Sequence, residues 1–209
     1  AWADAGPTVA ARFIRRLSAE GAWFADAPAR PGPDTPLLNA VHHQTWMVEL
    51  CDGLDADPGF AQAPTWRGAP AETGALARQR SDPLIAGLKP GPANRVLLRY
   101  VARLRELAGL LTGHSPAVAG AQALPGGGAV AWVENTRGLL IHQARFEAGR
   151  ARVYRIVAPT AWNFHPQGEL AGALLGVPAR DLTAVKQWAR HVVHSLDPCV
   201  ACRVEIDDA

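Results

Sequence analysis

The sequence predicts an α-rich α+β fold in which a small antiparallel β region follows a helical body. Two patterns support this: apolar residues recur at helical spacing over residues 94–111, and alternation replaces that spacing after Gly126-Gly127-Gly128. Helical spacing returns after Asp181. Because the chain has 209 residues, 48% of them hydrophobic, it can bury a core, and we expect one domain over residues 1–209.

The first part of the chain is expected to hold two helices separated by irregular segments. Residues 8–20 follow Pro7 and have an amphipathic pattern. A proline-rich connector over 26–36 leads to a second helix over 37–50, and a long proline-punctuated loop covers 52–91. The predicted inward face of the first helix comprises Val9, Phe13, Ile14 and Leu17.

The clearest predicted helix spans residues 94–111 and ends before Gly113. Its expected inward stripe is Leu97, Tyr100, Val101, Leu104, Leu107, Ala108 and Leu111. The arginines expected largely off that stripe are Arg95, Arg99, Arg103 and Arg105.

Strand patterns follow in the last third of the chain. We expect strands over 129–134, 139–146 and 151–158, with residues 147–150 as a hairpin turn. Residues 160–176 are predicted to be loop-rich with one helical turn. A last helix should run from an Asp181 N-cap through His194. Its inward residues would be Val185, Trp188, Ala189 and Val192.

Composition excludes several classes of function. The 21 basic and 19 acidic residues give a net charge of +2, and the arginines are scattered without interleaved aromatic residues, which argues against a nucleic-acid surface. No apolar run reaches the roughly 18 residues that a membrane span needs, and no signal-peptide pattern opens the chain. Three cysteines make no disulfide framework, so we expect a reduced, cytoplasmic protein.

The candidate metal ligands are Cys199 and Cys202, because two thiols three residues apart can reach one metal ion. A redox dithiol is one alternative, although such pairs usually lie at a helix N-terminus and this pair follows a helix. A zinc site that adds His191 and His194 is another, since structural zinc is typically tetrahedral with Cys and His ligands. A helix that continues to His194 need not turn these imidazoles toward the thiols.

Four segments resemble motifs of the large subunit of nickel–iron hydrogenases, in the order found in that family. Residues 195–205 resemble its Asp-Pro-Cys-x-x-Cys-x-x-His terminus, and 132–142 resemble Glu-Ala-Pro-Arg-Gly-x-Leu-x-His. Residues 158–163 resemble Pro-Thr-x-Trp-Asn, and 67–78 are similar to Gly-x-Pro-x-Glu-x-Gly-Pro-Leu-Ala-Arg. The resemblance covers about residues 64–205 and implies a partial fold of that subunit.

The departures from the family concern the metal ligands. The resemblance implies an active enzyme with four cysteines that hold iron and nickel, whereas beyond the terminal pair this chain has only Cys51, outside the family's Arg-x-Cys-Gly-x-Cys context. Cys51 is therefore interpreted as a buried small hydrophobic residue. Glu205 stands where the enzymes carry His, and the few residues after it argue against removal of a C-terminal extension. We expect no complete nickel–iron centre and no hydrogen oxidation.

Arg137 and Asp197 match family residues near the metal, with Thr136 in place of a proline. The resemblance implies that the guanidinium of Arg137 lies over anionic ligands such as iron-bound cyanide. A salt bridge, for example to Glu134, is the alternative for Arg137, and a helix-terminating turn before Pro198 is the alternative for Asp197.

A hydrogenase-like chain with half of the thiolate set resembles accessory proteins of the HupK/HoxV type. That resemblance implies a non-catalytic scaffold that holds or transfers the Fe(CN)2CO unit and meets assembly chaperones and the hydrogenase large subunit. One alternative is a C-terminal fragment of a catalytic large subunit, since the chain opens at Ala1 and has one methionine, Met47. Another is a protein that acts by docking alone and carries a structural zinc.

Overall fold

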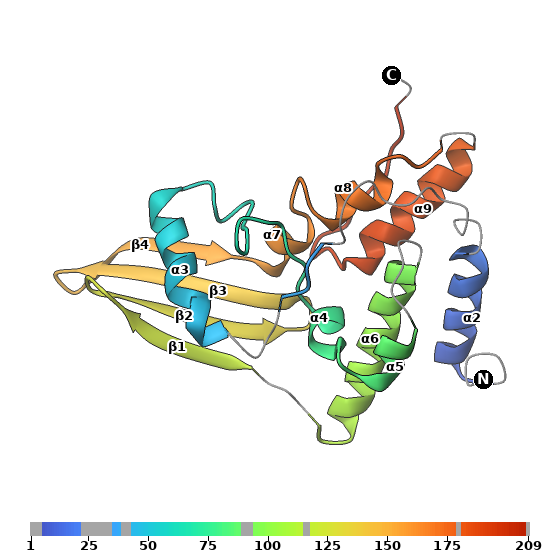
Figure 1. The fold of residues 1–209 in the computed structure, drawn as a ribbon, viewed down its shortest axis with the longest axis horizontal. Helices are drawn as coiled ribbons and strands as arrows, with labels where there is room; N and C mark the ends of the chain where they lie inside the picture. Colours follow the sequence, from blue (N-terminus) through green and yellow to red (C-terminus); the bar gives the residue numbers. More distant parts are fainter. Residues whose placement is uncertain are drawn as a thin grey trace. The chain divides into compact units, whose positions relative to one another are not determined.

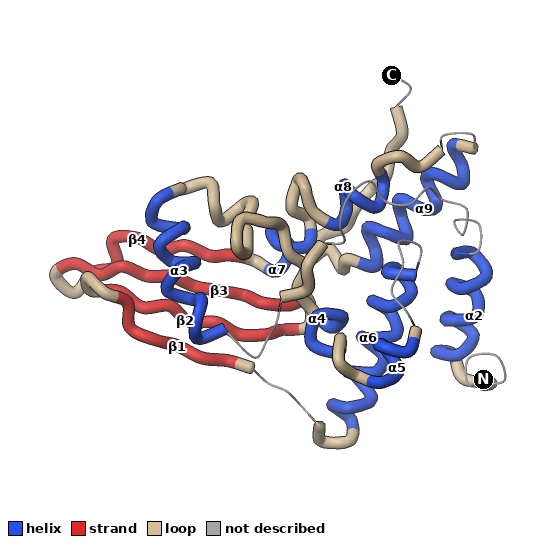
Figure 2. Tube along the Cα trace, in the orientation of Figure 1, coloured by secondary structure: helices blue, strands red, loops and turns tan. Residues whose placement is uncertain are grey.

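The computed structural model describes residues 6–21, 35–38, 43–88, 94–114, 118–178 and 181–207. They form helices and one antiparallel sheet (Figures 1 and 2). The predicted α+β class is confirmed. No helix among these residues is long and apolar enough to cross a membrane.

The chain divides into two units that are each built from separate stretches of sequence. A helical unit comprises Ala1–Asp34, Gln79–Ser115 and Leu170–Ala209, and a sheet unit comprises Thr35–Arg78 and Pro116–Glu169. Each unit is described by itself below. The single domain expected from the sequence stays a prediction.

The sheet unit contains four strands in the order β1-β2-β3-β4, each antiparallel to its neighbours. The predicted strands are confirmed as β2 (Gly128–Asn135), β3 (Gly138–Glu147) and β4 (Arg150–Val157), joined by tight turns. An additional strand, β1 (Ala119–Leu124), was not predicted. Its sequence Ala-Gly-Ala-Gln-Ala-Leu has no β-branched or aromatic residue, so pairing with β2 defines it rather than its own propensity.

Helix α3 (His43–Ala56) lies across one face of the sheet (Figure 1) and supplies five of the fourteen buried residues of its core. It begins and ends later than the predicted helix over 37–50, and residues 39–42 lie outside the described part of the chain. Alternate residues of the strands face this helix, as the period of two in a strand requires. Large side chains that are fully buried in this core include Met47, Leu54, Val130, Leu139, Ile141, Val157 and Trp162.

Four short helices interrupt regions that were predicted to be mainly loop. α4 (Ala75–Gln79) and α5 (Pro83–Gly87) lie within the predicted loop over 52–91, which is therefore partly wrong. α5 has a recognisable start that the prediction overlooked, because the Asp82 carboxylate accepts from Leu84 N at 2.9 Å and proline occupies the first turn. Later in the chain, α7 (Pro159–Asn163) and α8 (Glu169–Leu174) replace the one expected helical turn.

The helical unit is organised around α6 (Asn94–Leu111), whose predicted bounds are confirmed. α6 contacts α2 (Val9–Gly21), α5 and α9 (Leu182–Ser195). The predicted N-cap of α9 is also confirmed, since the Asp181 carboxylate accepts from Thr183 N at 2.9 Å and from Ala184 N at 3.2 Å. Most of the proline-rich connector predicted over 26–36 lies outside the described residues.

The predicted inward faces of α2 and α6 are partly wrong. In α2, Ile14 and Leu17 are buried as expected, but Val9 is 73% exposed. In α6, Arg95 and Arg99 are 6% and 3% exposed although arginines were expected to lie largely off the inward stripe. Arginine can be buried when its stem packs and its guanidinium finds acceptors, which hydrophobic periodicity does not reveal. At the far end of the same helix, Leu107 and Leu111 of the predicted stripe are 52% and 80% exposed.

Candidate functional site

The predicted metal ligands lie on an irregular segment that follows α9. Residues 196–207, which we call the cysteine tail, contain no helix or strand. Cys199 and Cys202 are both free and exposed, and the sulfur of Cys202 lies 3.5 Å from the Val200 carbonyl oxygen. Both thiols can therefore be reached from solvent.

The start of the cysteine tail is buried and held in place by arginines from α6. Ser195 and Leu196 are 1% and 3% exposed. Arg99 Nη1 donates to Ser195 Oγ at 3.0 Å, and Arg103 Nη1 donates to the Ser195 carbonyl oxygen at 3.0 Å. The Ser195 hydroxyl donates in turn to the Val192 carbonyl oxygen at 2.7 Å. The sequence analysis did not predict the contacts of Arg99 and Arg103 with Ser195, because it treated these arginines only as polar positions of the helix.

Asp197 ends α9 through its backbone. Its N–H donates to the His194 carbonyl oxygen at 3.2 Å, and its φ of 57° is in the left-handed region that usually follows a helix C-terminus. Aspartate adopts this conformation more readily than most residues, although the following Pro198 restricts it further. The backbone of Asp197 therefore forms a helix-terminating turn, and a role of its half-buried carboxylate beside a metal stays a prediction.

The four predicted zinc ligands all lie in the described part of the chain. His191 is half-buried and His194 is exposed on the last turns of α9. Among the residues that the structure describes, no three His, Cys, Asp or Glu side chains come together in a group that could hold a metal ion. A zinc ion bound by these histidines and the thiol pair therefore stays a prediction.

In the sheet unit, three of the sequence motifs meet in a set of residues that we call the motif junction: Thr73, Gly74, Arg137, Gly138 and Asn163. The side chain of Thr73 accepts from Leu139 N at 2.9 Å, and Thr73 N donates to Asn163 Oδ1 at 2.9 Å. Asn163 Nδ2 donates to the Arg137 carbonyl oxygen at 3.3 Å. One asparagine thus links the loop before α4 to the turn between β2 and β3.

The glycines of the motif junction permit a close approach of two backbones. Gly74 has a φ of 112°, and a Cβ there would lie 2.9 Å from the Arg137 carbonyl oxygen. Gly138 has a φ of 131°, and a Cβ there would lie 2.4 Å from Thr73 Cγ2. Both positions combine positive φ with lack of space, so they require glycine.

Arg137 sits on a turn with a defined backbone. Asn135 Oδ1 accepts from Arg137 N at 2.9 Å and from Gly138 N at 3.2 Å, which makes an Asx turn. The Arg137 side chain is half-buried. Glu134, suggested from the sequence as its salt-bridge partner, accepts from Arg78 Nη1 at 2.6 Å, and both of these side chains are at most 5% exposed. Arg137 belongs to the sheet unit and the cysteine tail to the helical unit.

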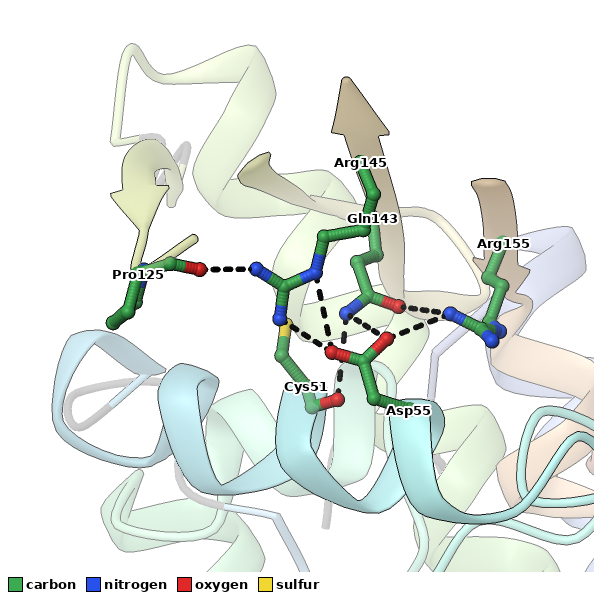
Figure 3. A network of polar contacts seen from close by, with 6 residues as sticks. All are labelled: Cys51, Asp55, Pro125, Gln143, Arg145 and Arg155. Atoms are coloured by element: carbon green, nitrogen blue, oxygen red, sulfur yellow. Dashed lines mark hydrogen bonds and ion pairs between the residues drawn. The ribbon is translucent and has the colours of Figure 1, made fainter. Parts of the chain in front are cut away.

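Cys51 is confirmed as a buried residue. It is fully inaccessible within α3, and burial, reinforced by the charge of Asp55, raises the pKa of its thiol to about 11. The Cys51 backbone takes part in a polar network above α3 (Figure 3). Gln143 Nε2 donates to the Cys51 carbonyl oxygen at 3.3 Å. At neutral pH this thiol stays protonated, and it is the thiolate form that binds metal.

Asp55 is the centre of the same network (Figure 3). Its carboxylate forms an ion pair with Arg145, accepts from Arg155 Nη1 at 2.8 Å and accepts from Gln143 Nε2 at 3.2 Å. Burial tends to raise the pKa of Asp55, but the hydrogen bond and charge of Arg145, the charge of Arg155 and the Gln143 hydrogen bond outweigh it and lower the pKa. The network ties α3 to β3 and β4 and has a structural role.

Comparisons with known proteins match this chain to nickel-dependent hydrogenases and to hydrogenase expression/formation proteins. Residues 113–205 match the sequence family described as nickel-dependent hydrogenase. The hydrogenase expression/formation protein HupK of Rhizobium leguminosarum bv. viciae is 37% identical over 172 residues, which are 78% of this chain and 45% of that protein. The hydrogenase expression/formation protein HoxV of Cupriavidus necator is 36% identical over 225 residues, covering 100% of this chain and 55% of that protein.

The chain is similar to the HupK and HoxV proteins. It spans about half the length of these curated relatives. Among solved structures, the nickel–iron–selenium hydrogenase of Desulfovibrio vulgaris Hildenborough is 22% identical, with a TM-score of 0.44 over 66% of this chain and 36% of that chain. The matched region of the nickel-dependent hydrogenase family includes the turn of Arg137 and both cysteines of the tail.

Proposed function

We propose that this chain is an accessory protein for the assembly of nickel–iron hydrogenase, a non-catalytic scaffold that holds the Fe(CN)2CO unit and passes it on. The similarity to hydrogenase expression/formation proteins over most of the chain supports the accessory role. Assembly chaperones and the hydrogenase large subunit are the expected partners, and the cytoplasm is the expected compartment.

The observation that carries the proposal is the exposure of both thiols on the cysteine tail. Thiolates are soft ligands that suit iron, and a cargo that brings cyanide and carbon monoxide of its own needs few ligands from the protein. Because nothing in the described chain covers Cys199 or Cys202, a partner protein can approach the metal from solvent and replace them. Four thiolates would hold the same iron more permanently.

Arg137 and Asp197 are proposed to act around the bound cargo rather than as ligands. The guanidinium group has planar donors that suit anionic cyanide, and Arg137 is attached to a turn whose backbone the motif junction holds. The carboxylate of Asp197 is two residues from the first thiol. Arg137→Met is expected to shift the cyanide bands of the loaded protein, and unchanged bands would remove Arg137 from this role.

The test is infrared spectroscopy on protein purified without oxygen from cells that express the hydrogenase assembly machinery. We expect bands of iron-bound cyanide and carbon monoxide that disappear in Cys199→Ser and in Cys202→Ser, with circular dichroism unchanged. Cys51→Ala is the matched control, because it removes a thiol that is buried and protonated, and it should keep the bands. If either tail variant held iron normally, the ligand assignment would be wrong.

The same experiment separates the alternatives. Absence of bands together with zinc in elemental analysis would favour a docking protein with a structural zinc. Nickel in the purified protein together with hydrogen oxidation would favour a piece of a catalytic large subunit. Either result would contradict the proposed carrier function.

A further inference from the structure

Three arginines recur at four-residue spacing along α6, at positions 95, 99 and 103. This spacing places side chains on one face of a helix. α6 contacts α9, and two of the three arginines donate to Ser195, the last residue of α9. Arg105 on the same helix instead pairs with Asp82 at 2.9 Å and has a side chain 46% exposed.

The two arginines contact the C-terminal end of α9, where an α-helix has carbonyl groups that need hydrogen-bond donors. The last carbonyl groups of an α-helix lack intrahelical partners, and positive charge near that end is favourable. Arg103 supplies a charged donor to the Ser195 carbonyl oxygen, and Arg99 supplies one to the Ser195 hydroxyl. Hydrogen bonds from charged donors are shorter and stronger than neutral ones. With Ser195 only 1% exposed, water cannot easily replace them.

We infer that Arg99 and Arg103 are positioning residues that fix the origin of the cysteine tail through Ser195. The inference rests on the proposed function, in which the tail carries iron. Cys199 follows Ser195 by four residues, so it cannot lie more than about 14 Å from that anchor. The direction in which the chain leaves Ser195 therefore determines which space the two thiols can occupy.

The test compares three substitutions in the full chain. Arg103→Met keeps the apolar stem and removes the donors, Arg103→Lys restores a charged donor, and Arg105→Met removes an arginine from the same helix that contacts Asp82 instead. The first measurement is hydrogen exchange at Leu196 N and Asp197 N, which donate to Val192 O, Val193 O and His194 O. We expect at least about tenfold faster exchange in Arg103→Met, partial rescue in Arg103→Lys and no change in Arg105→Met.

The second measurement is the infrared spectrum of the iron-loaded proteins. A looser tail should give the iron unit several environments, so the cyanide and carbon monoxide bands should broaden in Arg103→Met and sharpen again in Arg103→Lys. Unchanged exchange at residues 196–197 together with unchanged bands in Arg103→Met would overturn the inference. If Arg103→Met does not fold, Ser195→Ala removes the acceptor of Arg99 and is judged by the same two measurements.

The outcomes distinguish this inference from the proposed function. If the unmodified protein shows no bands, or if Cys199→Ser keeps them, the proposed function fails and no metal role remains for the arginines. If the bands depend on both cysteines but do not respond to Arg103→Met, the carrier function stands and the positioning role fails.

Discussion

The three thiols of this chain lie in two opposite environments. Cys51 is fully buried within α3, where burial raises the pKa of its thiol to about 11, whereas Cys199 and Cys202 are exposed on a segment without regular structure. The sheet unit around Cys51 is held by many cross-links between distant segments. The cysteine tail begins directly after Ser195, which two arginines of α6 hold, and its first residue, Leu196, is buried. One region suits rigidity and the other suits access by a partner.

The largest expected difference between the two regions is thiol reactivity. The pKa of the Cys51 thiol is raised from the ordinary value of 9.0 to about 11. Below pH 9, Cys51 therefore carries about a hundredfold less thiolate than a cysteine with the ordinary pKa, and its burial slows the reaction further. In the metal-free protein, iodoacetamide should therefore modify Cys199 and Cys202 first and Cys51 only in urea, as peptide mass spectrometry would show. Equal modification of all three thiols in the native protein would contradict the comparison.

The next largest effect is expected at the motif junction. Gly138→Ala would put a Cβ 2.4 Å from Thr73 Cγ2 at a φ of 131°, so it should lower the free energy of unfolding of the sheet unit by about 3 kcal/mol. Gly149→Ala is the matched control, because that glycine also has a positive φ of 73° but nothing within 4 Å of the added Cβ. Gly149→Ala should lower the free energy of unfolding, measured in urea, by only about 1 kcal/mol. Equal losses of unfolding free energy in the two variants would contradict this prediction and would mean that neighbouring atoms move to accept the Cβ at position 138.

A smaller effect is expected in the network of Figure 3. Asp55→Ala leaves Arg145 and Arg155 without their shared carboxylate, but the Asp55 side chain is 33% exposed, so water offsets part of the loss. We expect the free energy of unfolding to fall by about 2 kcal/mol. Glu147→Ala removes a carboxylate from a pair that is more than 60% exposed on both sides, and urea unfolding should detect a change of at most about 0.5 kcal/mol.

The smallest effect concerns pH and His165 in the sheet unit. Burial lowers the pKa of His165 below 6.5, and a hydrogen bond to the Ala63 backbone offsets this only in part. The folded protein therefore binds fewer protons than the unfolded chain as the pH falls through 6.5. Stability present above pH 6.5 should decline from there down to the folded pKa and then level off. Urea midpoints measured from pH 7.5 to pH 5 should show this slope in the wild type and lose it in His165→Asn.

Much of the candidate site could be predicted from short sequence patterns. The Cys-x-x-Cys spacing identified the two thiols, and the helical period predicted α6 and α9. The turn residues 147–150 predicted the hairpin of β3 and β4. These features depend on neighbours within about ten residues along the chain. The burial of Cys51 was also predicted, because Cys51 lies outside the Arg-x-Cys-Gly-x-Cys context in which the related enzymes bind metal.

Other features could not be predicted because their causes lie far away in the sequence. Ala-rich β1 is a strand only because β2 pairs with it. Arg99 was expected to lie off the inward stripe of its helix, but it is buried, and Ser195, 96 residues later in the chain, accepts its hydrogen bond. Asn163 Oδ1 accepts a hydrogen bond from Thr73 N, although the two residues are 90 positions apart in the sequence.

The sequence by itself determined which residues are candidates for metal chemistry, namely two cysteines three residues apart, and the order of the motifs around them. The tertiary structure alone decided that these thiols are exposed, that Cys51 is not, and that arginines from α6 hold the start of the tail. The physical reason is that local patterns report backbone preference and apolar periodicity, whereas burial and hydrogen-bond partners depend on which distant segments the fold brings together.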